Sequence, residues 1–441
     1  MAVFGDIRVF NRSLWFLERI VATGSLVLKR LGGDRAGEMA AQRLLASPHA
    51  SVEAILDTVS ERTGIACVGR EIVCAQDTSE INFKGKLSAP EGLGPGGDGR
   101  TAAFFVHPLV AIDVASGSVL GLAGAALWTR VEARVDPALK RGPLEKESHR
   151  WLLGAERAGA VLSQASRLTM VADRESDIYH LFANRPAHVE LVVRAAQNRA
   201  IEDGGLLFDA LSREAAVETR KVRIAARGPG DRERDASVEL RARRVVLKRP
   251  SGLSAEDAPA SLEVTLVEVR ECNPPAGKTP VLWRLLSSAD RSAGEIVKLY
   301  RLRWRIEEVF RALKSGLGLP ETQVNSVRRL LLLAAFGLAA ATRIIQLVDA
   351  RDGSHQSIET VIDPGFKPAL AAISRKLEGK TERQKNPHPP TSLAYLSWIC
   401  ARLGGWNCYY KPPGPKTMAT GWKTLAQQLA GYLIAIETKN V

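Results

Sequence analysis

The sequence lacks the cysteine and histidine patterns that mark structural zinc or a disulfide framework. Its five cysteines include no Cys-x-x-Cys pair, no histidine stands near them at zinc-ligand spacing, and the seven histidines form no His-Glu-x-x-His motif. These absences argue against a zinc-stabilised fold and a disulfide-stapled one. The cysteines concerned are Cys67, Cys74, Cys272, Cys400 and Cys408.

Long hydrophobic runs are also missing. The longest, Leu330–Thr342, has about 13 residues, whereas a helix needs about 20 to cross a bilayer. We therefore expect a buried helix there and no membrane partner. Met1–Asp6 has neither the basic start nor the apolar segment of a secretory signal, so we expect a cytoplasmic location.

Positive charge, in contrast, is abundant. The 441 residues include 61 Lys and Arg against 48 Asp and Glu, which gives a net charge of +13 and a pI near 9.7. Such a chain gains free energy by displacing the counterions condensed on a polyanion. Charge alone does not distinguish DNA, RNA and anionic membrane as the partner. The length of the chain allows two or three domains.

Hydrophobic periodicity divides the chain into helical and β-rich parts. Residues 7 to 62 follow a helical period, and Ser51 is a helix start. Apolar runs ending in an acid follow at Ile72–Asp77 and Leu168–Asp173, and further strands are expected at 102–114, 118–131 and 188–195. Helices are expected at 145–165, 176–184, 330–350 and in pieces up to about 437.

Between about 200 and 285 the pattern is one of strands and turns. Within it, Thr219–Pro250 holds eleven Lys or Arg against four acids. Such a basic β-region can follow a phosphate backbone. A solvated sheet face is the alternative interpretation.

The stretch Lys298–Lys314 is the most informative feature. On a regular helix, Tyr300, Arg303, Glu307 and Lys314 fall within an arc of roughly 60° over about 21 Å. One face therefore offers a carboxylate, two cations and a phenol, beside a separate apolar face. One acid among bases suits a metal ion next to a polyanion.

Three acids fit two-metal phosphoryl transfer. Mg²⁺ prefers oxygen ligands, and paired ions about 3.5 to 4 Å apart stabilise both the attacking and the leaving oxygen. Asp77 and Asp173 each follow an apolar strand, and Glu307 lies on the expected helix. We expect these three to be the catalytic and metal-binding residues.

These pieces resemble the DDE transposases of the Tn-five type, which are bacterial cut-and-paste enzymes. The resemblance rests on Gln76-Asp77-Thr78, on Asp173-Arg-Glu-Ser-Asp177, and on the Tyr-Arg-Glu-Lys spacing from Tyr300 to Lys314. Ser176 departs from the family's commoner Ala. Shorter similarities extend over nearly the whole chain, at 33–35, 44–55, 145–148, 273–275 and 401–405.

The resemblance implies an α/β fold with an RNase H-like mixed sheet core. It implies three parts: an N-terminal helical DNA-binding domain (1–64), a catalytic domain (65–350) with an all-β insertion (about 200–285), and a C-terminal helical dimerisation region (351–441). Two Mg²⁺ ions per active site, with Mn²⁺ as a substitute, are the implied cofactors. The implied partners are transposon inverted-repeat ends, target DNA and a second subunit in a synaptic complex, in a bacterial, nucleoid-associated setting.

The resemblance also assigns roles to single residues. Tyr300, Arg303, Lys314 and Arg194 match residues that contact DNA, the first three near the scissile phosphate. Trp283 matches a tryptophan on which a flipped base stacks while a terminal hairpin forms; a buried core role is its alternative.

Two other functions compete with transposition. Family members also occur as N-terminally shortened forms that pair with the full enzyme and inhibit it, and this chain begins a few residues before Gly5-Asp-Ile-Arg8, an early family motif. The second alternative is an RNase H-like nuclease that cuts without joining. The basic β-region, Trp283 and the C-terminal helices are hard to explain in such a nuclease.

Overall fold

The structure, a computed structural model, describes residues 6–83, 90–130, 142–212, 214–224, 234–275, 277, 279–353, 356–362, 364–409 and 412–439. The chain forms two compact units. The first unit comprises Met1–Gly69, Thr78–Arg134 and Arg305–Val441, and the second comprises Arg70–Asp77 and Val135–Trp304. The three-part division expected from the sequence remains a prediction.

The second unit is built on a mixed sheet. Its strands run in the order β1-β6-β7-β11-β10-β9-β8, with β1, β6 and β7 parallel and the others antiparallel. The parallel strands are short and almost entirely buried, as expected for strands covered on both faces. Their bounds are β1 Glu71–Gln76, β6 Arg167–Ala172, β7 Val189–Arg194, β8 Glu218–Ile224, β9 Arg234–Lys248, β10 Ser261–Cys272 and β11 Leu282–Ser287.

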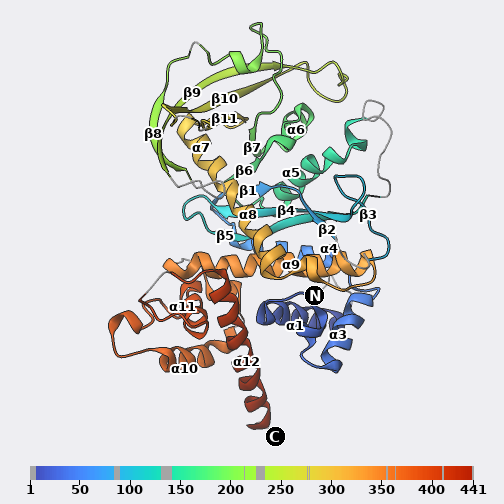
Figure 1. The fold of residues 1–441 in the computed structure, drawn as a ribbon, viewed down its shortest axis with the longest axis vertical. Helices are drawn as coiled ribbons and strands as arrows, with labels where there is room; N and C mark the ends of the chain where they lie inside the picture. Colours follow the sequence, from blue (N-terminus) through green and yellow to red (C-terminus); the bar gives the residue numbers. More distant parts are fainter. Residues whose placement is uncertain are drawn as a thin grey trace. The chain divides into compact units, whose positions relative to one another are not determined.

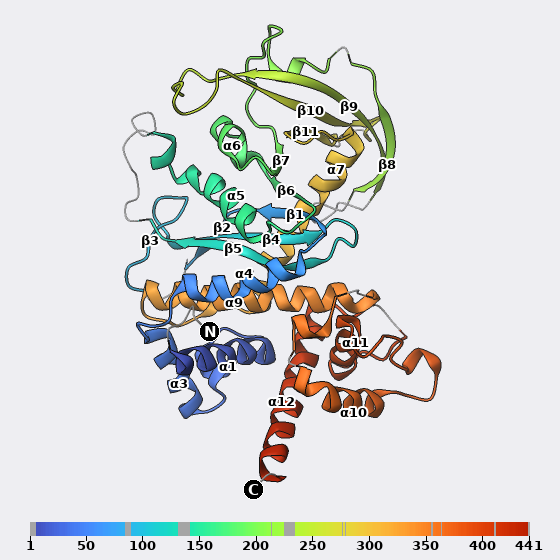
Figure 2. The same cartoon turned by 180° about the vertical axis from the view of Figure 1, so that it is seen from behind.

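Helices flank the parallel strands of this unit. In both views, α5 (Arg150–Val161) and α6 (Tyr179–Asn184) lie on one side of β6 and β7, and α7 (Ala293–Arg301) lies on the other (Figure 1, Figure 2). The helix expected at 145–165 is therefore present but shorter. Two 3₁₀ turns, Pro143–Glu145 and Glu147–His149, occupy its predicted start.

The β-rich character expected between about 200 and 285 is confirmed by β8 to β10. Strand β9 alternates between buried and more exposed side chains, as in a half-buried strand. Several of its arginines already have acidic partners: Arg234 pairs with Glu271, and Arg243 pairs with Asp203 at 2.8 Å. Part of the basic charge is thus neutralised locally.

The first unit combines helices with a small antiparallel sheet. In this sheet β4 pairs with β2, β3 and β5. The side chains of Asp6, Asp34 and Ser51 cap α1, α3 and α4, so the predicted start at Ser51 is confirmed. The bounds are α1 Ile7–Thr23, α2 Leu28–Gly32, α3 Arg35–Ala46, α4 Val52–Ala66, β2 Ser79–Asn82, β3 Gly94–Pro95, β4 Ala102–Asp113, β5 Val119–Trp128, α8 Arg305–Arg311, α9 Val327–Asp349, α10 Lys367–Leu377, α11 Leu393–Leu403 and α12 Pro415–Lys439.

Helix α9 is the centre of the first unit. It is the one described helix long and apolar enough to cross a membrane, but 83% of its most apolar stretch is buried inside the protein. Helix α1 packs against it through Phe16 and Phe336, whose ring centroids are 5.0 Å apart. Helix α4 and strand β5 also pack on α9 (Figure 2). The buried helix expected at Leu330–Thr342 is confirmed.

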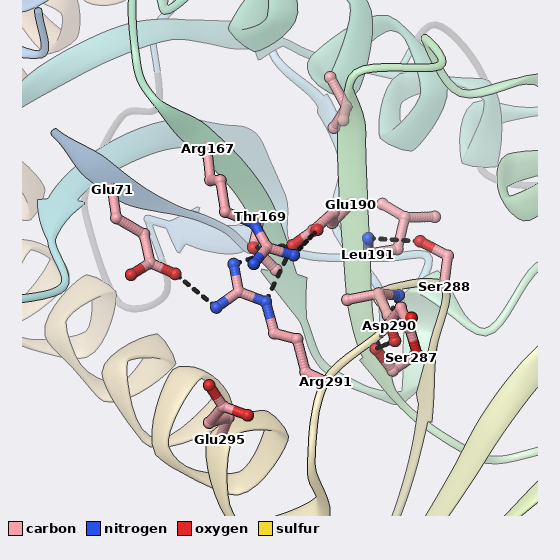
Figure 3. Close-up of polar contacts among 12 residues, drawn as sticks. Glu71, Arg167, Thr169, Glu190, Leu191, Ser287, Ser288, Asp290, Arg291 and Glu295 are labelled. Atoms are coloured by element: carbon pink, nitrogen blue, oxygen red, sulfur yellow. Dashed lines mark hydrogen bonds and ion pairs between the residues drawn. The ribbon is translucent and has the colours of Figure 1, made fainter. Parts of the chain in front are cut away.

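A buried arginine in the second unit anchors the start of α7 to the sheet. Arg291 precedes the N-cap Ser292, and its side chain is only 5% exposed. It donates to Glu71 at the start of β1 and, at 3.0 Å, to Glu190 in β7 (Figure 3). Thr169 donates to the same Glu190 oxygen at 2.9 Å. The network thus joins three parallel strands, β1, β6 and β7, to the helix that carries Tyr300.

Glu190 stays charged in this network. Burial alone would raise the pKa of Glu190, but Arg167, Thr169 and Arg291 hold the pKa below its usual value. Removing one partner of a buried pair leaves an uncompensated charge, which is costlier than losing an exposed pair.

We therefore predict that Arg291→Gln lowers the free energy of unfolding by about 3 kcal/mol. The matched control is Arg244→Gln, whose arginine is 60% exposed and lies 3.7 Å from its acidic partners. The control should stay within about 0.5 kcal/mol of the parent protein. Urea unfolding followed by circular dichroism measures both; equal losses would contradict an anchoring role for Arg291.

Candidate active site

Two aspartates occupy equivalent positions at the end of neighbouring parallel strands. Strand β1 pairs with β6 so that Ala75 lies opposite Val171. Asp77 and Asp173 each follow two residues after this pair. Because parallel strands end at the same edge of a sheet, both carboxylates belong to one edge of the second unit.

Asp77 is held by an arginine from the 3₁₀ turn that follows α7. The Arg303 guanidinium donates to the Asp77 carboxylate at 2.8 Å, and both side chains are about 15% exposed. The two residues are far apart in the sequence, and both belong to the second unit. A half-buried, charge-assisted bond of this kind fixes the carboxylate in position.

Asp173 is fixed by the turn that follows it. Its side chain accepts a hydrogen bond of 3.0 Å from the Glu175 backbone N–H, which caps the short 3₁₀ turn Arg174–Ser176. The buried Ser176 hydroxyl donates to the Asp173 backbone carbonyl at 2.7 Å. The serine that departs from the family pattern thus stabilises the turn that presents Asp173.

Three residues that the resemblance assigns to DNA contact lie close to one another: Tyr300, Arg194 and Trp283. The Trp283 and Tyr300 rings meet edge to face with centroids 5.7 Å apart, and Arg194 donates to the Leu282 carbonyl at 3.2 Å. Burial raises the pKa of Tyr300, although Arg303 and Arg194 oppose it. Burial lowers the pKa of Arg194, and Tyr300 and Asp173 oppose this shift. The charges of Arg303 and Asp173 therefore lie close enough to Arg194 to act on its pKa.

Trp283 is neither fully buried nor fully exposed. Its ring leans on Tyr300, and its neighbour Leu282 is exposed. An indole that packs against Tyr300 and is partly exposed is better suited to contact a ligand than to fill a core position.

Glu307 and Lys314 belong to the first unit. Lys314 donates to the Glu80 backbone carbonyl at 2.9 Å, and Glu80 in turn accepts from the Gly97 N–H at 2.7 Å. Burial lowers the pKa of Lys314, while Glu80 and Glu307 act in the opposite direction. The Lys314 charge thus has acids nearby, while its described hydrogen bond is to a neutral carbonyl.

The regular helix expected from Lys298 to Lys314 is wrong in detail. Helix α7 ends at Arg301, a 3₁₀ turn covers Leu302–Trp304, α8 follows, and a π-helical turn covers Ala312–Gly316. This turn ends at Gly316, and Gly318 follows it with a φ of 71°, which favours glycine. Because 3₁₀ and π turns advance by other angles than 100° per residue, the 60° arc does not hold throughout.

Three neighbouring acids have partners of their own. Asp177 accepts from the Ala196 and Gln197 backbone N–H groups at 2.6 and 2.7 Å, which organises the chain after β7. Glu175 pairs with Arg150 at 3.0 Å, and Glu308 pairs with Arg305. These contacts indicate a structural role for Asp177, Glu175 and Glu308.

Sequence reasoning missed several supporting residues. Arg291 and Glu190 lie outside the motifs, and His107 holds Thr78 through a 2.9 Å contact between its Nδ1 and the Thr78 hydroxyl. A charged residue in the mostly apolar run of β7, Glu190, is the one available signal. Nothing in the spacing identifies its partner.

The oxygen-donor set fits a hard divalent cation. Asp77 and Asp173 supply carboxylates at one rigid sheet edge, which is the ligand type that Mg²⁺ prefers. Within the described ranges, no three His, Cys, Asp or Glu side chains stand close enough to form a metal site by themselves. The ion pair of Asp77 with Arg303 engages one of the carboxylates.

A comparison with protein families adds an independent finding. Residues 169–342 match the family model of the transposase DDE domain. This stretch is less than half of the chain; it includes Asp173, Arg194, Trp283, Glu307 and Lys314, and it begins after Asp77. Over these residues the chain is therefore similar to the DDE domain of transposases.

Proposed function

We propose that this protein is a DDE transposase of the Tn-five type, which cuts DNA at the ends of a mobile element and joins those ends to target DNA. The observation that carries the proposal is the equivalent position of Asp77 and Asp173 after two paired parallel strands. Supporting it, the second aspartate lies in the stretch that matches the transposase DDE domain.

The core would be RNase H-like. The short buried strands β1, β6 and β7, with α5 and α7 beside them, support this assignment. Strands β8 to β10 and the strand β11 that returns to β7 would form the all-β insertion. The helices before β1 and after α9 would supply end binding and dimerisation, respectively.

Asp77, Asp173 and Glu307 would hold two Mg²⁺ ions, with Mn²⁺ as a substitute. When bound, such ions supply an activated water and neutralise charge on the phosphate. Strand ends hold their side chains rigidly, so the aspartates need little reorganisation. All three acids are present in the sequence, which a non-catalytic regulator does not require.

The remaining site residues would hold DNA. Arg303, Lys314 and Arg194 would contact phosphates, with the Tyr300 hydroxyl beside them, and Trp283 would stack on a flipped base.

Attack of water on the phosphodiester breaks the bond to the element's 3′ oxygen and leaves a 3′-OH. That 3′-OH attacks the opposite strand to form a hairpin, water reopens it, and the 3′-OH then attacks target DNA. No covalent bond between protein and DNA is needed.

The working form would be a homodimer in a synaptic complex, in the cytoplasm and associated with the nucleoid. One subunit would cut the DNA end held mainly by the other. The net charge of +13 is consistent with such a DNA-bound assembly.

Our first functional prediction concerns the acids. Asp173→Asn and Glu307→Gln should each slow cleavage of end-sequence DNA in Mg²⁺ on the order of a thousandfold, about 4 kcal/mol in activation free energy. Binding of the same DNA should stay within about twofold, because the acids do not contact phosphates favourably. Gel assays of nicks, hairpins and joined products measure cleavage, and anisotropy measures binding.

The control for this experiment is Glu156→Gln, which removes the same charge from an exposed position of α5. It should cleave at the parental rate. Full cleavage by Asp173→Asn or Glu307→Gln would refute the assignment of these acids. Cleavage without hairpins or joined products would favour a simple nuclease.

The second functional prediction concerns the cations. Lys314→Met should weaken end binding and reduce the slope of log K against log salt by about 0.9, because one phosphate contact is lost. Arg303→Met should also weaken end binding. The control Lys367→Met removes a charge that is already paired with Glu359 at 2.7 Å, and it should leave the slope unchanged. An unaltered slope for Lys314→Met would remove this residue from the DNA interface.

A further inference from the structure

A small cavity in the second unit lies where the start of α5, the helix α6 and the chain after β9 meet. Its volume is about 190 Å³, and its apolar wall includes Leu152, Ile178 and Leu253. Cavities that hold whole organic ligands commonly measure about 300 to 1,000 Å³. This cavity is smaller, so it suits an ion or a single group of a larger ligand.

Two histidines in the wall lack hydrogen-bond partners. The Nδ1 atom of His149 is buried and has no partner among the described residues. His180 in α6 is only 9% exposed, and its ring also makes no hydrogen bond with a described residue. Burial lowers the pKa of His180, Asp257 opposes this shift, and His149 adds to it, so the two rings lie close together. Because an unpaired buried polar group is costly, a ligand that bonds to these rings is favoured.

The charged side chains of the wall are both cations. Lys146 forms no ion pair with a described residue, and the residues that form the wall include no Asp or Glu. Arg199 donates to the Asp177 carboxylate, which balances its charge. The nearby Asp257 lies outside the wall and accepts hydrogen bonds from the backbone and hydroxyl of Ser254. Lys146 therefore brings a positive charge to the cavity that no wall residue neutralises.

The start of α5 adds backbone donors. The 3₁₀ turn Glu147–His149 runs directly into α5, and no described side chain caps either start. The first N–H groups of a helix have no partner within the helix, and the positive end of the helix dipole favours a negative charge. Ser148 lies in the cavity wall and offers a hydroxyl, whereas Glu147 is exposed and lies outside the wall. Together these groups select a negatively charged ligand with several oxygen acceptors.

We propose that this cavity binds a single phosphate group, either a free phosphate ion or a backbone phosphate of DNA. Its oxygens would accept hydrogen bonds from four side chains at the start of α5 and in α6: Lys146, Ser148, His149 and His180. A metal cation, the other common partner of paired imidazoles, is disfavoured because Lys146 and Arg199 line the same wall. A phosphate offers strong acceptors and the charge that balances the lysine.

Isothermal titration calorimetry of the full chain with inorganic phosphate tests this proposal. About 0.15 M sodium chloride in the cell screens diffuse attraction to the basic chain. Phosphate should bind at one site, and Lys146→Gln should weaken it at least about tenfold, because a charge-assisted hydrogen bond is lost. The matched control Lys298→Gln removes an exposed lysine from α7 and should leave the affinity unchanged.

A second variant tests the cavity without removing a donor. Leu253→Trp fills the cavity from its apolar side, so it should abolish phosphate binding while Lys146 and both histidines are retained. Circular dichroism confirms that each variant is folded. Absence of phosphate binding to the parent protein, or equal phosphate affinity in the parent and Lys146→Gln, would overturn the proposal. These titrations contain no DNA, so their failure is separate from any failure of the proposed transposase function.

The source of the phosphate group follows from repeating the titration on protein saturated with double-stranded DNA. Binding of inorganic phosphate that persists assigns the site to a free ion. Loss of this binding, together with a smaller salt dependence of DNA binding in Lys146→Gln, assigns the site to a backbone phosphate. Either result supports the cavity as a phosphate site.

Discussion

The parallel register of β1 with β6 is the constraint on which the candidate active site depends. Backbone hydrogen bonds between these strands bring two aspartates, far apart in the sequence, to the same edge of one sheet. A slip of one residue would turn one of these side chains to the other face. The pairing is resistant to slipping because both strands are buried along nearly their whole length.

Helix α7 fixes the residues that would hold DNA relative to these strands. Its start is tied to β1 and β7 through Arg291, at the end of the strands opposite to Asp77 and Asp173. Its end carries Tyr300 and leads to Arg303, which pairs with Asp77. The helix is thus fixed at both ends against the same strands. Under the proposed function, the Arg303 guanidinium that pairs with Asp77 would also contact a phosphate, so it would serve both groups.

Much of this arrangement could be predicted from the sequence because it follows from local patterns. Apolar runs that end in an acid identified Ile72–Asp77 and Leu168–Asp173, and a capping serine identified the helix after Ser51. The broken helix from Lys298 to Lys314 could not be predicted, since hydrophobic periodicity averages over several turns and does not resolve a short 3₁₀ or π turn within a helix. The pairing of Arg303 with Asp77 was missed because charged side chains carry no periodic signal of their long-range partners.

The most direct test of the central claim is whether Asp77 and Asp173 bind one cation jointly. Fe²⁺ placed in the site with ascorbate and peroxide generates radicals that cut the backbone beside the bound ion, and mass spectrometry locates the cuts. The account predicts cuts next to residues 77 and 173 that excess Mg²⁺ suppresses, and loss of both cuts in Asp77→Asn. Cuts near 173 that persist unchanged in Asp77→Asn would contradict it.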